Sequence, residues 1–186
     1  MMKGGRKLST DELGRLDVSE FKMARKLPVT VVLDNVRSLH NIGSIFRSCD
    51  AFRVEKLVLC GISTPPPHRE IHKSALGAEL SVDWEYFAET PLAIMKLRET
   101  AYTLIACEQT ASSVPLERLY LENPNPPLAL VFGHEIRGVS QQVIDLCDHT
   151  VEIPQFGTKH SFNIAVSVGI VLWEISRAGI LSRPIS

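Results

Sequence analysis

The stretch IPQFGTKHSFNIAVS, residues 153–167, joins the end of one apolar segment to the start of a second, longer one. The connection is polar and flexible over residues 157–160, and Gly157 permits a sharp change of direction there. Ser161 or Asn163 can cap the helix that we expect to follow. A charged loop directly in front of a buried helix predicts that the loop and the helix start enclose a ligand.

On either side of this stretch, short apolar runs alternate with helical patterns. The runs predict buried strands at residues 29–36, 55–62, 102–110, 128–135 and 149–155, with a weaker one at 81–87. Their continuous Val, Ile and Leu content is typical of strands covered on both faces. Helices are predicted at residues 41–52, 90–101, 140–147 and about 162–178. The alternation predicts an α/β fold, with a mostly parallel sheet flanked by helices.

The predicted helix ends rest on capping residues. Asn41 occupies the position expected of a helix cap, and the helices at 90–101 and 140–147 each begin with a capping-type residue. Gly179 is expected to end the last helix.

The N-terminal residues 9–26 predict one more helix. Ser9 or Thr10 is expected to cap it, with Glu12 in the capping-box position. The expected division of the chain is an N-terminal helical extension, residues 1–26, followed by one domain, residues 27–186.

Length and composition are those of a globular chain. It has 186 residues, 45% of them hydrophobic and 22% charged, enough for one domain with a sizeable core. No apolar stretch reaches the roughly 18 residues needed to span a bilayer. The N-terminus lacks the apolar segment of a secretory signal. We therefore expect a cytoplasmic protein that does not enter the membrane.

The charges are distributed unevenly. Residues 1–73 carry 13 Lys and Arg against 8 Asp and Glu, whereas residues 74–186 carry 7 against 13, for a net charge of −1. A basic N-terminal half is suited to binding a polyanion. A chance imbalance explains the same numbers, so charge alone leaves both interpretations open.

Cysteine and histidine spacing does not predict a metal site. Four cysteines without a C-x-x-C pair are expected to be buried, reduced thiols: Cys49, Cys60, Cys107 and Cys147. His68 and His72 flank Glu70 with the spacing of a helix face, but no third ligand is evident nearby. We therefore expect no metal.

The first polar motif is HNIGSIFRSCDAF, residues 40–52. Gly43 permits close approach of another chain or a ligand at the first helical turn. Arg47 points away from the apolar stripe of the helix, as a solvated arginine or a ligand-binding arginine would. Its expected position at the carboxyl edge of a parallel sheet, where such folds bind ligands, favours binding.

A second motif, VFGHEIRGVS, covers residues 131–140. A buried strand ends at Gly133, and Glu135 follows in a tight loop whose backbone can face a ligand; an ordinary strand-to-helix turn is the alternative. The third motif is the opening stretch, which leads to the small residues Ala165 and Gly169. The helix that contains them is apolar nearly all round, so we expect its own sheet and a second subunit to cover it.

Together these motifs resemble those of the SpoU/TrmH-type RNA ribose methyltransferases of the SPOUT class. The patterns N-x-G-x-x-x-R, G-x-E-x-x-G and I-P-x-x-G-x-x-x-S-x-N match Asn41, Gly43 and Arg47; Gly133, Glu135 and Gly138; and Ile153, Pro154, Gly157, Ser161 and Asn163. The resemblance covers about residues 29–178. The departures are His134, Gln155 and Phe162, where members commonly carry Asn or Gln, Met, and Leu. The phrases EQTASS and VEIPQ look most similar to the tRNA guanosine-2′-O branch.

This resemblance implies a fold, a cofactor and partners. It implies a trefoil knot near the C-terminus and S-adenosylmethionine as methyl donor, bound by three loops. The implied cofactor-binding residues are Glu108, Gln109, Gly133, Ile153, Gly157 and Phe162. It also implies an RNA substrate, with tRNA favoured, and a homodimer formed through the last helix and the helix of the first motif.

The resemblance implies catalytic roles for five residues: Arg47, Asn41, Glu135, Ser161 and Asn163. Arg47 is the family's favoured actor, but a guanidinium stays protonated, with a pKa above about 12. We therefore expect it to stabilise the developing alkoxide, with literal proton abstraction as the alternative. Asn41 is expected to orient the substrate or Arg47, and Glu135 to hold its loop.

Other functions remain open at this point. The RNA substrate can be ribosomal rather than transfer RNA, and the chain can be a non-catalytic RNA-binding knot protein. A nucleotide-binding α/β enzyme such as a dehydrogenase is disfavoured, because no G-x-G-x-x-G follows the first strand. The cations of residues 1–26 can extend an RNA-binding face, or that segment can simply pack on the sheet.

Overall fold

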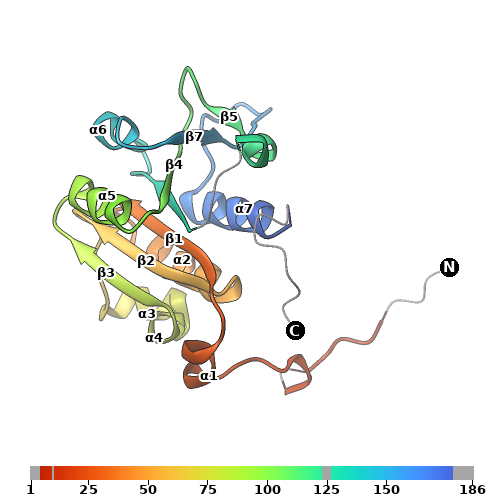
Figure 1. The fold of residues 1–186 in the computed structure, drawn as a ribbon. Helices are drawn as coiled ribbons and strands as arrows, with labels where there is room; N and C mark the ends of the chain where they lie inside the picture. The colour runs from red at the N-terminus through yellow and green to blue at the C-terminus, as the bar shows by residue number, and fades with distance from the viewer. Residues whose placement is uncertain (1–4, 10, 123–126, 178–186) are drawn as a thin grey trace.

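The structure, a computed structural model, describes residues 5–9, 11–122 and 127–177. Its centre is a seven-stranded sheet in the order β3-β2-β1-β6-β4-β7-β5 (Figure 1), and every neighbouring pair is parallel. The strands are β1 (Leu27–Asp34), β2 (Val54–Cys60), β3 (Asp83–Phe87), β4 (Thr103–Cys107), β5 (Val114–Pro115), β6 (Leu128–Phe132) and β7 (His149–Glu152). The predicted α/β fold with a parallel sheet is confirmed.

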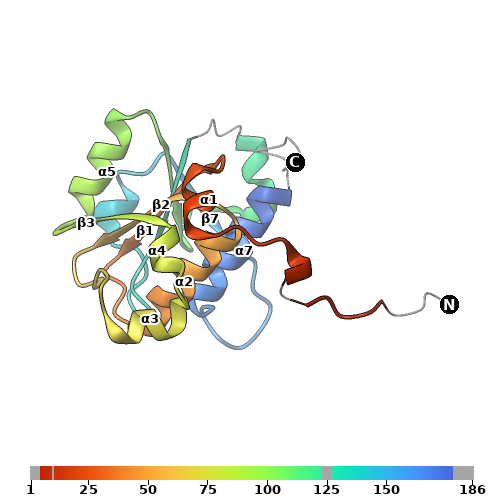
Figure 2. The same ribbon diagram turned by 90° about the horizontal axis from the view of Figure 1, so that it is seen from below.

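Helices cover both faces of this sheet. Those described are α1 (Val18–Met23), α2 (Leu39–Ala51), α3 (Arg69–Ala75), α4 (Ala78–Ser81), α5 (Thr90–Glu99), α6 (Gln141–Ile144) and α7 (Ile164–Arg177), with 3₁₀ turns at Asp11–Leu13 and Leu116–Glu122. Helices α2, α3, α4 and α7 pack on one face, and α5 and α6 on the other (Figures 1 and 2). No described helix has the length and apolarity to cross a membrane.

The core therefore consists of two layers separated by the sheet. Successive strand residues point to opposite faces: Val31 and Leu33 join the layer under α2 and α7, whereas Val32 joins the layer under α5. All three are fully buried. This two-sided burial is the reason that the strands read as continuous apolar runs.

Several predicted strands are too long at their carboxyl ends. The run at 102–110 stops as a strand at Cys107, and the run at 128–135 stops at Phe132. The residues beyond each end form loops: Gln109 N and Thr110 N donate to side-chain oxygens of Glu108 and Ser113, and His134 N donates to Gly138 O within the loop after β6. The sequence reading also missed β5, α3 and α4, which are short.

The predicted helix caps were partly wrong. Ser38, rather than Asn41, caps α2, and its hydroxyl accepts a hydrogen bond from Asn41 N at 3.3 Å. Ser140 occupies the cap position of α6 without a side-chain bond, and Glu89 occupies that of α5. Gly179 lies outside the described residues.

The single helix predicted over residues 9–26 was also wrong. That segment contains a short 3₁₀ turn and then α1, which Asp17 caps in a capping box with Glu20. Between them Gly14 has a φ of 55°, which breaks the helical run. The described residues before α1, 5–9 and 11–17, extend away from the sheet (Figures 1 and 2).

Candidate active site

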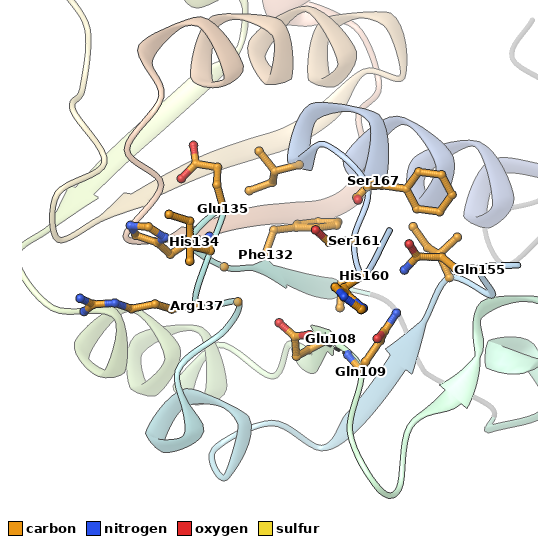
Figure 3. A pocket seen from close by; sticks show the side chains of 17 residues that line it. Glu108, Gln109, Phe132, His134, Glu135, Arg137, Gln155, His160, Ser161 and Ser167 are labelled. Atoms are coloured by element: carbon orange, nitrogen blue, oxygen red, sulfur yellow. Dashed lines mark hydrogen bonds between the residues drawn. The ribbon is translucent and has the colours of Figure 1, made fainter. Parts of the chain in front are cut away.

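A cavity of about 280 Å³ opens where β4, β6 and β7 end. Three chain segments line it: residues 107–109 after β4, residues 132–138 after β6, and parts of 153–167 between β7 and the first turns of α7. In Figure 3, Glu108 and Gln109 lie on one side of the opening and His160 and Ser161 on another. The carboxyl edge of a parallel sheet is the usual place for a ligand in such a fold.

Glu108 fastens the loop that follows β6. Its Oε2 accepts a hydrogen bond from Val139 N at 2.9 Å, and its Oε1 accepts one from Gln109 N at 2.8 Å. At Gly138, where φ is 66°, an added Cβ would lie 2.0 Å from Glu108 Oε2. The loop therefore needs glycine there to seat its backbone on this carboxylate.

A second glycine lets the same loop fold back on itself. His134 N donates to Gly138 O at 3.0 Å, and Gly138 N donates to His134 O at 2.8 Å. A Cβ at Gly133 would lie 2.0 Å from the carbonyl carbon of Gly138. Close contacts thus explain both glycines of the G-x-E-x-x-G spacing: Gly133 approaches the backbone of Gly138, and Gly138 approaches the Glu108 carboxylate.

Glu135 connects this loop to the start of α2. Its carboxylate accepts hydrogen bonds from Ser38 N at 2.9 Å, Arg37 N at 3.2 Å and Asn41 Nδ2 at 3.3 Å. Burial by itself raises the pKa of Glu135, but the bonds from backbone N–H groups and from Asn41 outweigh it and leave the pKa below its ordinary value. Glu135 is therefore ionised at neutral pH, with its lone pairs already used.

A chain of hydrogen bonds continues from Glu135 to α7. Asn163 Nδ2 donates to Asn41 Oδ1 at 3.1 Å, across 122 positions of sequence. Asn163 Oδ1 in turn accepts from Ala165 N at 2.9 Å in the first turn of α7. Three predicted site residues therefore form one connected network that ties the three motifs together.

Most of the other predicted site residues line the cavity, but not all of them do. The cavity lining includes Glu108, Gln109, Gly133, Glu135, Ile153, Ser161 and Phe162. Gly157 is not part of that lining, and a Cβ added there would meet nothing within 4 Å.

Arg47 does not line this cavity either. It is exposed on α2, about 9 Å along the helix axis from Asn41 at 1.5 Å per residue. Its guanidinium makes no hydrogen bond or ion pair with any described residue. Within one chain, the arginine and the cavity do not meet.

Gly43 has a different neighbour from the expected second chain or ligand. A Cβ there would lie 2.0 Å from Ser74 Oγ and 2.5 Å from Ile71 O. The first helical turn of α2 is instead in close contact with α3 of the same chain.

Sequence reasoning missed several functional candidates. Phe132, His134, Arg137, Gln155, His160 and Ser167 also line the cavity. Most of them are immediate neighbours of motif residues, which is the signal that identifies them.

Asp34 had no such signal. It is 2% exposed, and its carboxylate accepts from Thr90 Oγ1 at 2.5 Å, Asn35 Nδ2 at 2.9 Å and Ser140 N at 2.9 Å.

The four cysteines and the pair His68 and His72 have ordinary surroundings, and Cys107 also lines the cavity. All four cysteines are free, and burial raises the pKa of the Cys60 thiol to about 12. His68 Nδ1 accepts from Glu70 N at 3.2 Å, and His72 Nδ1 lies 2.5 Å from Glu79 Oε1. Among the described residues, no three His, Cys, Asp or Glu are grouped as metal ligands.

Comparison with known proteins places this geometry among RNA methylases. The sequence matches the family described as "SpoU rRNA Methylase family" over residues 28–173. It is 29% identical over 170 residues to the tRNA (guanosine(18)-2′-O)-methyltransferase of Aquifex aeolicus, with 86% of this chain and 76% of that protein covered. It is also 29% identical over 156 residues to a 23S rRNA (guanosine-2′-O-)-methyltransferase of Neisseria meningitidis, with 84% and 61% covered.

The solved structures that resemble this one are likewise described as rRNA and tRNA modifying enzymes. The AdoMet-bound rRNA methyltransferase of Sinorhizobium meliloti aligns with a TM-score of 0.76 at 27% identity, covering 83% of this chain and 58% of that one. The A. aeolicus TrmH/SpoU tRNA modifying enzyme aligns with a TM-score of 0.76 at 26% identity, covering 90% and 85%. The chain thus spans less than two thirds of both rRNA enzymes and more than that of both tRNA proteins.

Proposed function

The chain belongs to the SpoU family of RNA methylases, and on that premise we propose that it methylates the ribose 2′-oxygen of a guanosine in tRNA, with S-adenosylmethionine as donor. The observation that carries this proposal is the network Glu135–Asn41–Asn163 beside the cavity, which unites the three motifs in one place. A guanosine in 23S rRNA is the second candidate, because the Neisseria relative acts there at the same level of identity.

The cavity suits the proposed cofactor. It combines apolar walls from Phe132, Ile153 and Phe162 with lining residues from three loops, whose backbone groups we expect to bond a flat, neutral adenine. Glu108 adds a carboxylate at its edge, which favours a ligand that carries positive charge. S-adenosylmethionine, when bound, supplies a methyl group activated by a positively charged sulfur.

With an activated methyl group, the chain's own residues must orient the ribose hydroxyl and favour loss of its proton. Glu135 is poorly suited to accept that proton, because its lone pairs are used by N–H donors and its pKa is low. We assign it to holding Asn41 and the loop. Arg47 is assigned to stabilising the developing alkoxide, as the family resemblance implies, with Ser161 and Asn163 beside the cavity.

A homodimer would bring Arg47 to a cavity that its own chain does not offer it. The outward side of α7 carries Val166 and Trp173, which are 49% and 61% exposed. Gly169 lies between them with nothing within 4 Å of an added Cβ. An exposed apolar helix face next to an incomplete site fits contact with a second copy. The trefoil knot implied by the family resemblance stays a prediction.

We also propose that the N-terminal extension has two parts. Residues 18–26 are structural, since Phe21 of α1 is 5% exposed and belongs to the core under α2. The preceding segment is exposed and carries Arg6 and Arg15. Deleting residues 1–16 while keeping α1 should leave the melting temperature unchanged and lower the salt dependence of tRNA binding. An unchanged salt slope would mean that the segment does not contact RNA.

The enzyme assignment is tested with labelled cofactor. Wild-type protein should transfer tritiated methyl groups to bulk tRNA in preference to ribosomal RNA, and digestion should yield 2′-O-methylguanosine.

Arg47→Ala should abolish transfer and leave cofactor affinity in calorimetry nearly intact. Binding of RNA and cofactor without any transfer would support the non-catalytic alternative, and equal loss of transfer and cofactor affinity in Arg47→Ala would reject the role of Arg47.

A further inference from the structure

A second cavity, of about 390 Å³, lies beside the first. It is lined by Asp34 and Asn35 at the end of β1, Ile62 after β2, and the loop residues His134, Arg137, Gly138 and Ser140. His134, Arg137 and Gly138 line both cavities, so the loop after β6 is the wall between them. The volume falls within the roughly 300–1,000 Å³ of pockets that hold small molecules.

The floor of the second cavity is held rigidly. The buried Asp34 carboxylate is bonded to Thr90 Oγ1, Asn35 Nδ2 and Ser140 N, so β1, α5 and the start of α6 are fixed together. Asn35 Oδ1 accepts from Ile62 N at 3.2 Å, which fixes the segment after β2. Such a site is preorganised for a ligand rather than shaped by one.

Two hydrogen-bond donors and one apolar surface of this cavity are available to a ligand. Arg137 is exposed, makes no hydrogen bond or ion pair among the described residues, and points away from Glu108 and His160 in Figure 3. His134 Nδ1 accepts from Ile136 N at 3.0 Å, so in the neutral ring the proton lies on Nε2 and makes it a donor. Ile62 is 55% exposed, an apolar surface at the rim.

We propose that this second cavity receives the guanine base of the target nucleotide, with Arg137 bonded to its O6 and N7 edge. The inference rests on the proposed function. A ribose hydroxyl at the first cavity leaves the base one sugar ring away, and the two cavities are one loop apart. Guanine presents two adjacent acceptors, which a guanidinium matches with two bonds, whereas adenine presents a donor at N6. A base that enters a pocket must be unstacked from the RNA, as in other base-handling enzymes.

Direct binding is measured without any methyl transfer. In protein labelled at isoleucine methyl groups, excess guanosine monophosphate should shift the Ile62 signal, whereas cytidine monophosphate should not. Ile94, a fully buried residue of α5, is the internal control. Arg137→Gln should weaken guanosine monophosphate binding by about 5- to 150-fold, the range for one bidentate base contact. No shift at Ile62, or equal shifts with both nucleotides, would overturn the proposal.

Activity supplies a second, separable readout. Arg137→Gln and Ile62→Trp, which fills the cavity from its rim, should both reduce formation of 2′-O-methylguanosine in tRNA, while Arg118→Gln, an exposed arginine elsewhere, should not. Cofactor affinity should stay unchanged in all three variants. If Arg137→Gln weakens cofactor binding and Ile62→Trp methylates normally, Arg137 serves the first cavity and the inference fails. If wild-type protein labels no RNA at all, the proposed function itself fails.

Discussion

At the scale of single residues, Gly43 shows how a missing side chain positions two helices. Gly43 was identified in the sequence as a position of close approach, but its neighbour α3 was not, because no local sequence pattern predicted that helix. An added Cβ would lie 2.0 Å from Ser74 Oγ, 2.5 Å from Ile71 O and 2.9 Å from Ala75 N. Two of these atoms are backbone and cannot move without shifting α3.

Gly43→Ala should therefore destabilise the protein by about 1–3 kcal/mol, the usual cost of overpacking, despite alanine's better helix propensity. Thermal or urea unfolding measures the change. Ser44→Ala, one residue along the same helix, should change the free energy of unfolding by less than about 0.5 kcal/mol. Equal stability of the two variants would show that α3 does not press on Gly43.

Glu135 is a residue whose charge matters for stability. Its pKa is lowered in the folded protein, so its bonds stabilise the fold above its ordinary pKa of 4.5, and this stabilisation is lost as pH falls through the depressed value. Glu135→Gln should flatten the decline of stability below about pH 4.5 and cost about 1–3 kcal/mol at neutral pH. Urea unfolding as a function of pH, with the exposed Glu99→Gln as control, measures both effects. A pH profile unchanged from wild type would contradict the assigned pKa direction.

At the scale of elements, Asp34 is the point where β1, α5 and the start of α6 are joined. Three donors from three segments converge on one buried carboxylate, which has no positively charged partner among the described residues. Because Ser140 N is bonded here and Val139 N is bonded to Glu108, two carboxylates hold the end of the loop that lines both cavities. The end of this loop is thus held in place by residues outside the loop.

Asp34→Asn should place an amide N–H₂ against donors and cost about 1–3 kcal/mol of stability. It should also raise hydrogen exchange at the Val139 and Ser140 amides and weaken cofactor binding, since the loop loosens. Thr90→Val, which removes a single donor, is the matched control and should leave exchange at Ser140 near the wild-type rate. Global destabilisation with no local change at these two amides would argue against a loop anchor.

At the scale of the whole molecule, the open question in the geometry is how Arg47 reaches a cavity. One chain leaves it exposed on α2, while α7 presents an apolar outer face. The proposed dimer, in which each copy supplies Arg47 to the other copy's cavity, would account for both observations. Such sharing has a consequence for mixtures of inactive variants.

Arg47→Ala and Asn163→Ala should each be strongly impaired alone, yet regain about a quarter of wild-type activity when refolded together, because half the molecules are mixed dimers with one intact site. Labelled methyl transfer to tRNA measures the recovery. Trp173→Glu should dissociate the dimer in sedimentation and abolish the recovery. A mixture no more active than its components would place both residues in the same chain's site.

Much of the architecture is encoded locally. Continuous apolar runs predict strands covered on both faces, and the positions of five of the seven described strands follow from them. β3 was predicted from a weaker pattern, and none of its residues is fully buried. The glycines at 133 and 138 and the polar residues of the three motifs could likewise be selected from the sequence. Helix caps and the N-terminal segment were predicted less well, since one glycine or one serine moves a boundary by several residues.

The meeting of the site residues was decided only by the tertiary structure. Asn41 and Asn163 are 122 positions apart, and they touch because the sheet order continues from β1 through β6 and β4 to β7, and α7 packs against α2. The same arrangement gives Gly43 its neighbour, leaves Arg47 outside its own cavity and opens a second cavity. Periodicity reflects the burial and backbone bonding of adjacent residues, whereas these contacts depend on how distant segments pack, which no local pattern specifies.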